Sequence, residues 1–325
     1  MSSPTADAIP ASETPHAGVV ARSVARSFGS VHAVRDVTFD ARPGRITGLV
    51  GPNGAGKTTL FLMLASLLAP DRGEIRIGDI DPVADPSAAR ERIGWMPDAL
   101  GAWESLSARE TLTIAGRLYG APKAQAVDRA DELLAEVGLG ELATAPARVL
   151  SRGQKQLLGF ARALVHRPSV LLLDEPASGL DPAARIALRR HLRALADDGA
   201  AILVSSHVLS ELEEMVDDAV FMSEGATVAH QHDASSHGQP RDWRLRVAGT
   251  RQSGPGPWRD AVARVLPEAN IRIDRRDLVL AFPDEVHAAQ GLSDLVAAGI
   301  LVAEFAPASG DLESAFLQMK DGGER

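Results

Sequence analysis

The sequence predicts an α/β protein with a mostly parallel sheet, a helical insertion and a small α+β domain near its C-terminal end. Three observations lead to this prediction. Short aliphatic runs at 45–50, 170–173 and 201–205 alternate with amphipathic stretches, as is typical of parallel strands that are buried on both faces. Between about residues 98 and 167 the strand pattern gives way to helical spacing. After Gly225 the chain becomes polar before short apolar runs resume.

These patterns divide the chain into four parts. Residues 1–17 are polar and lack an apolar signal core, which predicts a disordered tail. Residues 18–229 are expected to form the main domain, and residues 230–240 have the composition of a linker. Residues 241–325 are expected to form the small α+β domain, in which a second linker-like run, SGPGP, occupies 253–257.

Within the small domain, the alternation of apolar and polar residues predicts three strands and two helices. The strands are expected at 243–247, 271–273 and 278–282, and the helices at 258–265 and 286–298. This pattern leaves open whether the domain regulates, dimerises or packs on the main domain.

Composition excludes several kinds of protein. The 325 residues carry 34 lysines and arginines against 43 acids, a net charge of 34 − 43 = −9, and the basic residues are scattered. Nucleic acid is therefore not expected as a partner, because binding to its phosphates needs clustered positive charge. The absence of cysteine excludes disulfides and thiolate metal sites. No apolar run approaches the ~20 residues of a membrane-spanning helix, so a role at a membrane would need another chain.

A glycine-rich loop follows the apolar run at 45–50. The segment GPNGAGKT at 51–58 fits the pattern G-x-x-x-x-G-K-[ST] between a predicted strand and a predicted helix. Its backbone N–H groups and the helix N-terminus are suited to phosphate oxygens. Lys57 is expected to reach the β- and γ-phosphates and the Thr58 hydroxyl to ligate Mg²⁺. The alternative, a turn that binds nothing, is disfavoured by the correct flanking elements. The candidate nucleotide-binding residues here are Gly51, Pro52, Asn53, Gly54, Ala55, Gly56, Lys57, Thr58 and Thr59.

Four further stretches follow in order. LSRGQ at 150–154 opens an amphipathic helix with Ser151 as its expected N-cap. An apolar run at 170–173 ends in Asp174 and Glu175, SGLD follows at 178–181, and His207 comes after the strand at 201–205. Over residues 19–228 the chain resembles an ATP-binding subunit of an ABC transporter. The resemblance implies a P-loop NTPase core that binds ATP with Mg²⁺, and it rests on all five motifs in sequence.

The resemblance also implies roles for the polar residues at the strand ends. Asp174 would hold Mg²⁺, usually through water, and Glu175 would act as the general base or water-positioning residue. His207 would contact the γ-phosphate and hold the attacking water. Taken alone, each carboxylate would more readily be a helix cap or a salt-bridge partner, and the histidine a packing residue. Their order beside the phosphate loop favours catalysis.

The stretch at 150–154 implies a second copy of the site. In this family the residues corresponding to Ser151, Gly153 and Gln154 face the nucleotide of the opposite subunit. Asp181 ends the stretch at 178–181, which corresponds to the family's D-loop. The resemblance therefore implies a head-to-tail dimer, either of this chain or with a paralogue. Lys57 and Ser151 lie 94 residues apart (151 − 57), which leaves no room for the long coiled coils of chromosome-organising relatives.

Phe28 occupies the position at which the family places an aromatic residue that stacks on adenine, and a core phenylalanine is the alternative reading. Stacking of a base on an aromatic ring tolerates different bases.

Two positions depart from the commonest family pattern. Asp98 stands where a glutamine usually contacts Mg²⁺ and water, so its main task is either catalytic or coupling to a membrane partner. Arg152 replaces a glycine, and this change, with DLESAFLQM at 311–319, resembles ABC-2 type exporters.

These expectations combine into one functional hypothesis. The chain is expected to be the ATP-hydrolysing subunit that powers a separate membrane-spanning permease, peripheral to the cytoplasmic side of the cell membrane, in an ABC-2 type exporter. Two alternatives stay open at this point. One is a soluble ABC-type ATPase that acts without a membrane partner. The other is a regulatory subunit that hydrolyses ATP weakly, which Asp98 leaves possible.

Overall fold

The computed structural model describes residues 18–98, 104–232, 241–248, 254–274 and 277–308. They form two compact units. The first holds the described residues up to Val208 together with 215–230, and the second holds 209–214 and the described residues after 230. The predicted tail at 1–17, the run at 311–319 and residues 233–240 of the predicted linker lie outside the described residues.

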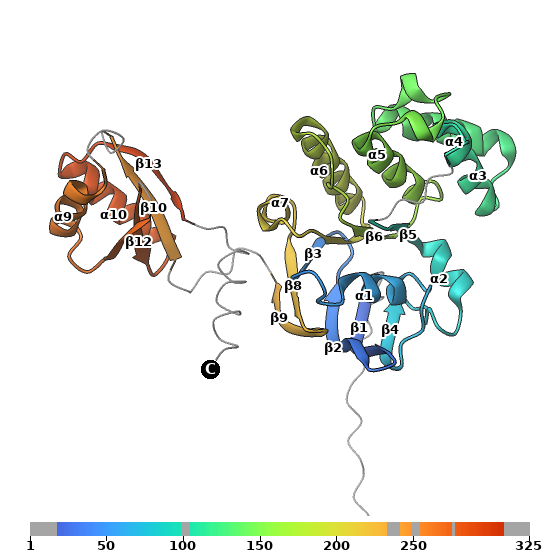
Figure 1. The fold of residues 1–325 in the computed structure, drawn as a ribbon, viewed down its shortest axis with the longest axis horizontal. Helices are drawn as coiled ribbons and strands as arrows, with labels where there is room; N and C mark the ends of the chain where they lie inside the picture. Colours follow the sequence, from blue (N-terminus) through green and yellow to red (C-terminus); the bar gives the residue numbers. More distant parts are fainter. Residues whose placement is uncertain (1–17, 99–103, 233–240, 249–253, 275–276, 309–325) are drawn as a thin grey trace, which may run out of the picture. The chain divides into compact units, whose positions relative to one another are not determined.

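A nine-stranded sheet forms the centre of the first unit (Figure 1). Strands β3, β5, β6, β7 and β8 pair in parallel, whereas β1 pairs antiparallel with both β2 and β4. The strands lie in the order β4 (Arg72–Ile77), β1 (Val19–Phe28), β2 (Val31–Ala41), β9 (Ala226–His232), β8 (Asp218–Ser223), β3 (Ile46–Val50), β7 (Ala201–Ser205), β6 (Val170–Asp174) and β5 (Ile93–Met96).

The three predicted strands of the parallel part are confirmed as β3, β6 and β7. Every residue in each of them is buried, which explains why they read as unbroken apolar runs. Side chains such as Leu49, Leu172 and Leu203 belong to one hydrophobic core, and burying such a side chain contributes about 1.5–3 kcal/mol. Parallel pairing brings the carboxyl ends of these strands to the same edge, and the loop at 51–56 begins there.

The antiparallel strands β1, β2 and β4 were not expected in this arrangement. In these strands exposed residues interrupt the buried ones, as at Arg76 between Ile75 and Ile77 in β4, because one face packs on the core and the other meets solvent. Such half-buried strands lack the continuous apolar run that marks β3. The fold class is therefore α/β with a mixed sheet whose centre is parallel.

The insertion between β5 and β6 is helical in its described part, as predicted. Ser107 and Ser151 each begin a helix with a reciprocal capping box, in which Glu110 and Gln154 return the hydrogen bond. The expected N-cap at Ser151 is thus confirmed. Among the described residues, none of the helices has the length and apolar character needed to cross a membrane. The α-helices that the structure describes before β10 are α1 (Lys57–Leu64), α2 (Pro86–Arg92), α3 (Ala108–Leu118), α4 (Lys123–Glu136), α5 (Arg152–Ala163), α6 (Pro182–Asp197) and α7 (Leu209–Glu213).

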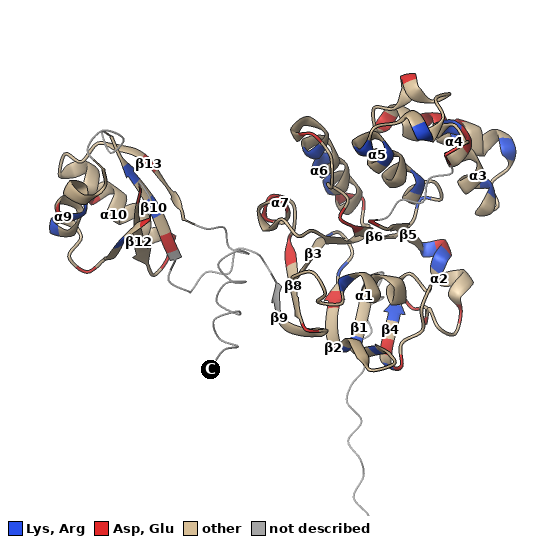
Figure 2. Cartoon of the chain, viewed as in Figure 1, with Lys and Arg blue, Asp and Glu red and all other residues tan. Residues whose placement is uncertain are grey.

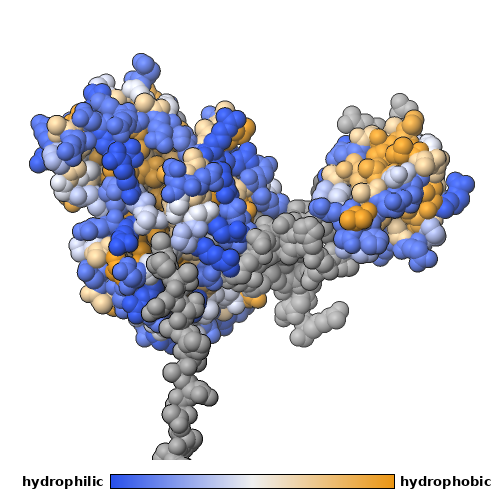
Figure 3. All heavy atoms as spheres, turned by 180° about the vertical axis from the view of Figure 1, so that it is seen from behind, coloured by the Kyte–Doolittle hydropathy of each residue, from blue (hydrophilic) through white to orange (hydrophobic). Residues whose placement is uncertain are grey.

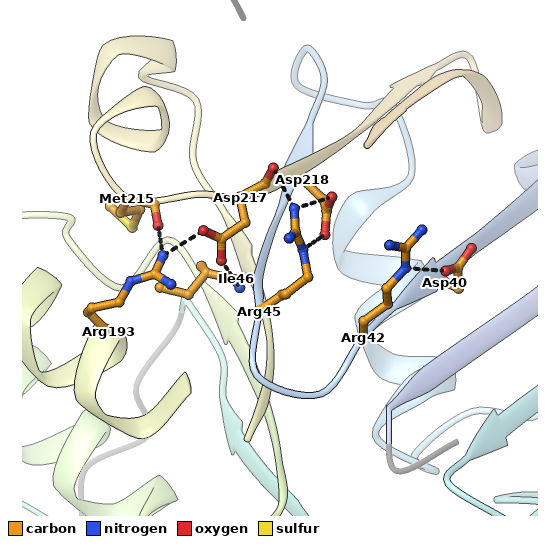
Figure 4. Close-up of polar contacts among 8 residues, drawn as sticks. All are labelled: Asp40, Arg42, Arg45, Ile46, Arg193, Met215, Asp217 and Asp218. Atoms are coloured by element: carbon orange, nitrogen blue, oxygen red, sulfur yellow. Dashed lines mark hydrogen bonds and ion pairs between the residues drawn. The ribbon is translucent and has the colours of Figure 1, made fainter. Parts of the chain in front are cut away.

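Two arginines fix the start of β8 against the start of β3 (Figure 4). Arg45 donates to both carboxylate oxygens of Asp218, at 2.7 and 2.9 Å, and the Asp218 side chain is fully buried. Arg193 donates to Asp217 at 2.9 Å, and the second oxygen of Asp217 accepts from the backbone N–H of Ile46 at 2.8 Å. The two aspartates therefore hold the register of β3 and β8. Elsewhere, acidic and basic residues are spread over both units (Figure 2).

The second unit contains a four-stranded antiparallel sheet with the order β11–β12–β10–β13. Its chain order, strand–helix–strand–strand–helix–strand, is the split β-α-β arrangement of ferredoxin-like folds, which the sequence reading did not specify. Apolar residues reach its surface (Figure 3). The large apolar side chains that are exposed in the described part of this unit are those of Ile273, Val286, Val296 and Leu301. The elements are β10 (Arg241–Val247), α9 (Gly256–Val265), β11 (Asn270–Asp274), β12 (Asp277–Phe282), α10 (Glu285–Ala297) and β13 (Val302–Pro307).

Two predicted boundaries are wrong. Strand β9 continues through His232, so residues 230–232 are strand, although their polar side chains resemble a linker. Helix α9 begins at Gly256 and has Pro257 in its first turn, so the end of the run at 253–257 is helix. Proline at the first helical positions needs no backbone donor, and this explains why a proline-rich run can open a helix.

Candidate functional site

The loop between β3 and α1 approaches its neighbours so closely that glycine is required at two positions. A Cβ atom on Gly51 would lie 2.5 Å from the carbonyl oxygen of Met222, and one on Gly56 would lie 2.3 Å from that of Ala33. Gly56 also has a φ of 96°, in the left-handed region that favours glycine. The loop is therefore fixed between β2 and β8.

Lys57, the first residue of α1, is buried with 8% of its surface exposed. Its ammonium group donates to the carbonyl oxygens of Gly51 at 2.6 Å and Pro52 at 3.1 Å. Burial lowers the pKa of Lys57, and the nearby charges of Glu175 and Asp174 partly oppose this shift. The loop thus holds a desolvated positive charge, which suits a phosphate group.

Asp174 ends β6 with its carboxylate held by two hydroxyl groups. Thr58 in α1 donates to one oxygen at 3.1 Å, and Ser205 at the end of β7 donates to the other at 2.6 Å. Asp174 and Ser205 are register partners in the paired strands. Ser205 was not identified from the sequence, because only the pairing of β6 with β7 places it there.

Glu175 and His207 meet across the same strand ends. The His207 ring nitrogen Nδ1 lies 2.8 Å from Oε2 of Glu175. Burial raises the pKa of the Glu175 carboxyl, while the hydrogen bond and charge of His207 oppose the shift. Glu175 has a φ of 53°, which is strained for a residue with a side chain. Its N–H donates to Ser205 at 3.0 Å, and its carbonyl oxygen accepts from Gln156 at 2.8 Å.

Lys57, Asp174, Glu175 and His207 line a cleft of about 600 Å³, a size within the range of small-molecule sites. The strand ends and the loop bring together most of the predicted residues, and Asp98 reaches the cleft as well. Five lining residues were not among the predicted site residues: Val31, His32, Ala33, Arg152 and Ser178. The predicted residues in the lining are Asn53, Gly54, Gly56, Lys57, Thr58, Thr59, Asp98, Asp174, Glu175 and His207.

Phe28 is not part of the cleft lining. It ends β1 with 49% of its surface exposed, so it is not a core residue, and the guanidinium carbon of Arg26 lies 5.1 Å from the centre of its ring. His32, one of the lining residues, is hydrogen-bonded to Ser27 at 2.8 Å. The β1–β2 turn therefore carries two aromatic rings, of which the histidine lines the cleft.

Of the remaining predicted residues, Gly51, Pro52 and Ala55 belong to the glycine-rich loop but do not line the cleft. Those in the stretches at 150–154 and 178–181 have structural contacts of their own. Ser151 and Gln154 form the capping box of α5, with distances of 3.2 and 2.9 Å, and Asp181 caps α6 through the N–H of Ala184 at 2.8 Å. A Cβ on Gly153 would lie 2.9 Å from the carbonyl oxygen of Gly179. None of these predicted residues lines the cleft.

A sheet with a parallel centre, a glycine-rich loop that leads from one strand into a helix, a buried lysine and two carboxylates at the end of a second parallel strand define a phosphate-loop nucleotide-binding ATPase. The profile of the ABC transporter family matches residues 34–178. The chain belongs to this family of ATP-binding proteins. It is an ATPase, and ATP-binding subunits of this family dimerise and work with membrane permeases.

Individual relatives extend the match over almost the whole chain. The uncharacterized ABC transporter ATP-binding protein YxlF of Bacillus subtilis (strain 168) is 33% identical over 298 residues, which cover 91% of this chain and 97% of YxlF. The daunorubicin resistance ATP-binding protein DrrA3 of Streptomyces coeruleorubidus is 33% identical over 303 residues, covering 90% and 93%. A solved ATP-binding subunit of an ABC transporter superposes with a TM-score of 0.62 at 29% identity, covering 66% of this chain and 90% of that one.

Proposed function

We propose that this chain hydrolyses Mg·ATP in the cleft between the loop at 51–56 and the strand ends, and that the reaction drives export through a separate permease. The observation that carries the proposal is the convergence of Lys57, Asp174 and Glu175 on one cleft. A buried cation, a carboxylate bonded to a hydroxyl group and a carboxyl with a raised pKa serve three different needs of phosphoryl transfer.

The residues of this chain divide the chemistry among them. The loop N–H groups and Lys57 bind the phosphates and offset their charge. Glu175 in its ionised form orients the attacking water and accepts its proton. His207, hydrogen-bonded to Glu175, keeps that carboxylate in place and contacts the γ-phosphate. Because burial raises the pKa of Glu175, it is a stronger base than an exposed glutamate.

The donor set fits a magnesium ion. Thr58 and Asp174 offer a hydroxyl and a carboxylate oxygen 3.1 Å apart, and hard oxygen donors of this kind are the ligands that Mg²⁺ prefers. Thr58 would hold the ion directly and Asp174 through water. Bound there with the nucleotide, Mg²⁺ would neutralise charge on the β- and γ-phosphates. Asp98 offers a further carboxylate on the same cleft.

The proposed active form is a head-to-tail dimer, with a second copy or a paralogue. Ser151, Gly153, Gln154 and Asp181 do not line the cleft of their own chain, and Ser151 opens α5 at an exposed position. At a helix N-terminus they are suited to the γ-phosphate of a nucleotide bound by the opposite subunit. ATP would then favour the closed dimer more than ADP does, and this difference in affinity would drive the conformational cycle.

Export is favoured over import by the relatives. DrrA3 is a daunorubicin resistance protein, and resistance is consistent with removal of a drug from the cell. For this chain we therefore propose a membrane permease as partner, a place on the cytoplasmic side of the membrane, and an ABC-2 type exporter as the assembly. Phe28 would stack on adenine at the mouth of the cleft after a change in its contact with Arg26.

ATP turnover by the purified chain tests the enzymatic part. Glu175→Gln should bind ATP with unchanged affinity and lose at least about 100-fold in kcat, a loss typical of general-base removal. Lys57→Ala should weaken ATP binding. Wild-type turnover by Glu175→Gln would refute the assignment of the base. Absence of turnover in the wild type would favour a regulatory subunit.

Isolation of the complex tests the partner. Tagged Glu175→Gln would be purified with ATP from detergent-solubilised membranes of its native host. A polytopic membrane protein in stoichiometric amount is the expected result. Recovery from the cytosol alone, with ribosomal or DNA-repair proteins, would exclude the permease and support a soluble ABC-type ATPase.

A further inference from the structure

Two side chains of α5 hold the turn that carries Glu175. Gln156 donates its amide N–H to the carbonyl oxygen of Glu175 at 2.8 Å, and Arg152 donates to the hydroxyl of Ser178 at 2.8 Å. Arg152 and Gln156 are four residues apart, so they lie on the same face of the helix. One face of α5 thus contacts both the beginning and the end of the Glu175–Ser178 turn.

This turn needs support from outside. Glu175 has a φ of 53°, a conformation that persists only where neighbouring contacts impose it. Inside the turn, the N–H of Ser178 donates to the carbonyl oxygen of Glu175 at 3.1 Å, so this oxygen accepts two hydrogen bonds. The second comes from Gln156, a polar side chain with only 4% of its surface exposed. A buried side-chain amide in this position has few other hydrogen-bond partners within reach.

The path of the Arg152 side chain depends on Gly179, the glycine that follows the turn. Gly179 has a φ of 74°, and a Cβ atom there would lie 3.0 Å from both Cδ and Nε of the arginine. The side chain therefore passes over Gly179 to reach Ser178, and it lines the nucleotide cleft of its own chain. Among the described residues it forms no ion pair, and Asp98, Asp174 and Glu175 line the same cleft.

We infer that Arg152 and Gln156 are positioning residues for hydrolysis, which hold the Glu175 carboxylate in place and link it to the N-terminus of α5. The inference rests on the proposed function, in which Glu175 is the base and the N-terminus of α5 faces the nucleotide of the partner. A displacement of α5 on dimer closure would be passed through these two contacts to the base. Occupancy of one site would thereby adjust the geometry of the other.

Gln156→Met tests the buried contact, because methionine keeps the length of the side chain and removes the donor. We expect kcat to fall about 10- to 100-fold, since a displacement of about 1 Å at a catalytic group has an effect of this size. The KM for ATP should stay within twofold, because the phosphate loop is untouched. Gln125→Met, the same change at an exposed position of α4, is the control and should turn over at the wild-type rate.

The exposed hydrogen bond between Arg152 and Ser178 is tested with Arg152→Ala, Ser178→Ala and the double variant. This test stays informative even if Gln156→Met fails to fold. If the two residues act through their hydrogen bond, the double variant should be no slower than the slower single variant, and Arg152→Lys should recover part of the rate. Multiplying effects in the double variant would overturn the Arg152–Ser178 link. A folded Gln156→Met with kcat within twofold of the wild type would overturn the role of Gln156.

Glu175→Gln measured in parallel distinguishes a failure of the positioning role from a failure of the proposed function. Turnover that depends on Glu175 but not on Gln156 or Arg152 would leave the proposed function standing and refute the positioning role. Turnover that does not depend on Glu175 would refute both.

Discussion

The ion pair between Arg45 and Asp218 (Figure 4) makes a quantitative prediction about stability. The Asp218 side chain is fully buried, whereas that of Arg45 keeps 29% of its surface exposed. Arg45→Met would leave a buried carboxylate without the two hydrogen bonds of 2.7 and 2.9 Å that Arg45 donates to it. Removal of one partner of a buried pair costs about 3–5 kcal/mol, and we expect about 3 kcal/mol here because Arg45 is partly exposed.

Thermal unfolding measures this loss. A domain of about 200 residues loses about 2–4 °C in Tm per kcal/mol, so Arg45→Met should lower the Tm of the first unit by about 6–12 °C. Its transition can be recognised because a non-hydrolysable ATP analogue, which binds only the folded site, should raise it. Nucleotide affinity should fall as well, because β8 contributes the Met222 carbonyl that packs on the phosphate loop.

Two further variants test whether desolvation of Asp218 causes the loss of stability. Arg76→Met removes an ion pair of 2.6 Å whose side chains are 44% and 53% exposed, and it should cost less than about 1 kcal/mol. Arg45→Met combined with Asp218→Leu removes the buried charge with its partner and should recover most of the lost stability. If Arg45→Met were no more destabilising than Arg76→Met, or if the double variant were less stable than Arg45→Met, desolvation of Asp218 would not be the cause.

Three other predictions follow from the site and from the second unit. The pKa of Glu175 is raised and that of Lys57 is lowered, so ATP turnover should be confined to a narrower pH range. As the pH is lowered, kcat should begin to fall at a higher pH than it would with an exposed glutamate as the base. As the pH is raised, ATP affinity should begin to fall at a lower pH than it would with an exposed lysine. Gly56→Ala should abolish nucleotide binding, measured by titration with a fluorescent ATP analogue, because its Cβ would lie 2.3 Å from a carbonyl oxygen; Gly120→Ala, strained by a φ of 85° but open, should retain binding. A hydrogen bond from Arg246 lowers the pKa of Asp277. The ionised carboxylate therefore stabilises the second unit at a pH above the ordinary aspartate pKa, and this stabilisation is lost as the pH falls through the lowered pKa. Asp277→Asn should be less stable than the wild type to thermal unfolding at neutral pH and equally stable in strong acid.

Much of the fold and of the nucleotide site could be predicted from the sequence, because the signals are local. Strands buried on both faces have continuous apolar runs, and β3, β6 and β7 were found in this way. The loop at 51–58 is determined by glycines at fixed places, and the capping box at Ser151 needs only four consecutive residues. Where half-buried strands or a proline-led helix depart from such signals, as in β4 and at the start of α9, the sequence reading missed the arrangement or the boundary.

The sequence by itself determined the class of protein, since the five motifs and their order carry the nucleotide chemistry. The tertiary structure decided which side chains support that chemistry. Ser205 lies beside Asp174 because β6 pairs with β7, and Gln156 reaches Glu175 because α5 packs against the following turn. These contacts join residues about 20 to 30 positions apart, and no local pattern specifies them. The physical reason is that strand pairing and helix packing bury shared apolar surface, and the positions of the polar side chains follow from that packing.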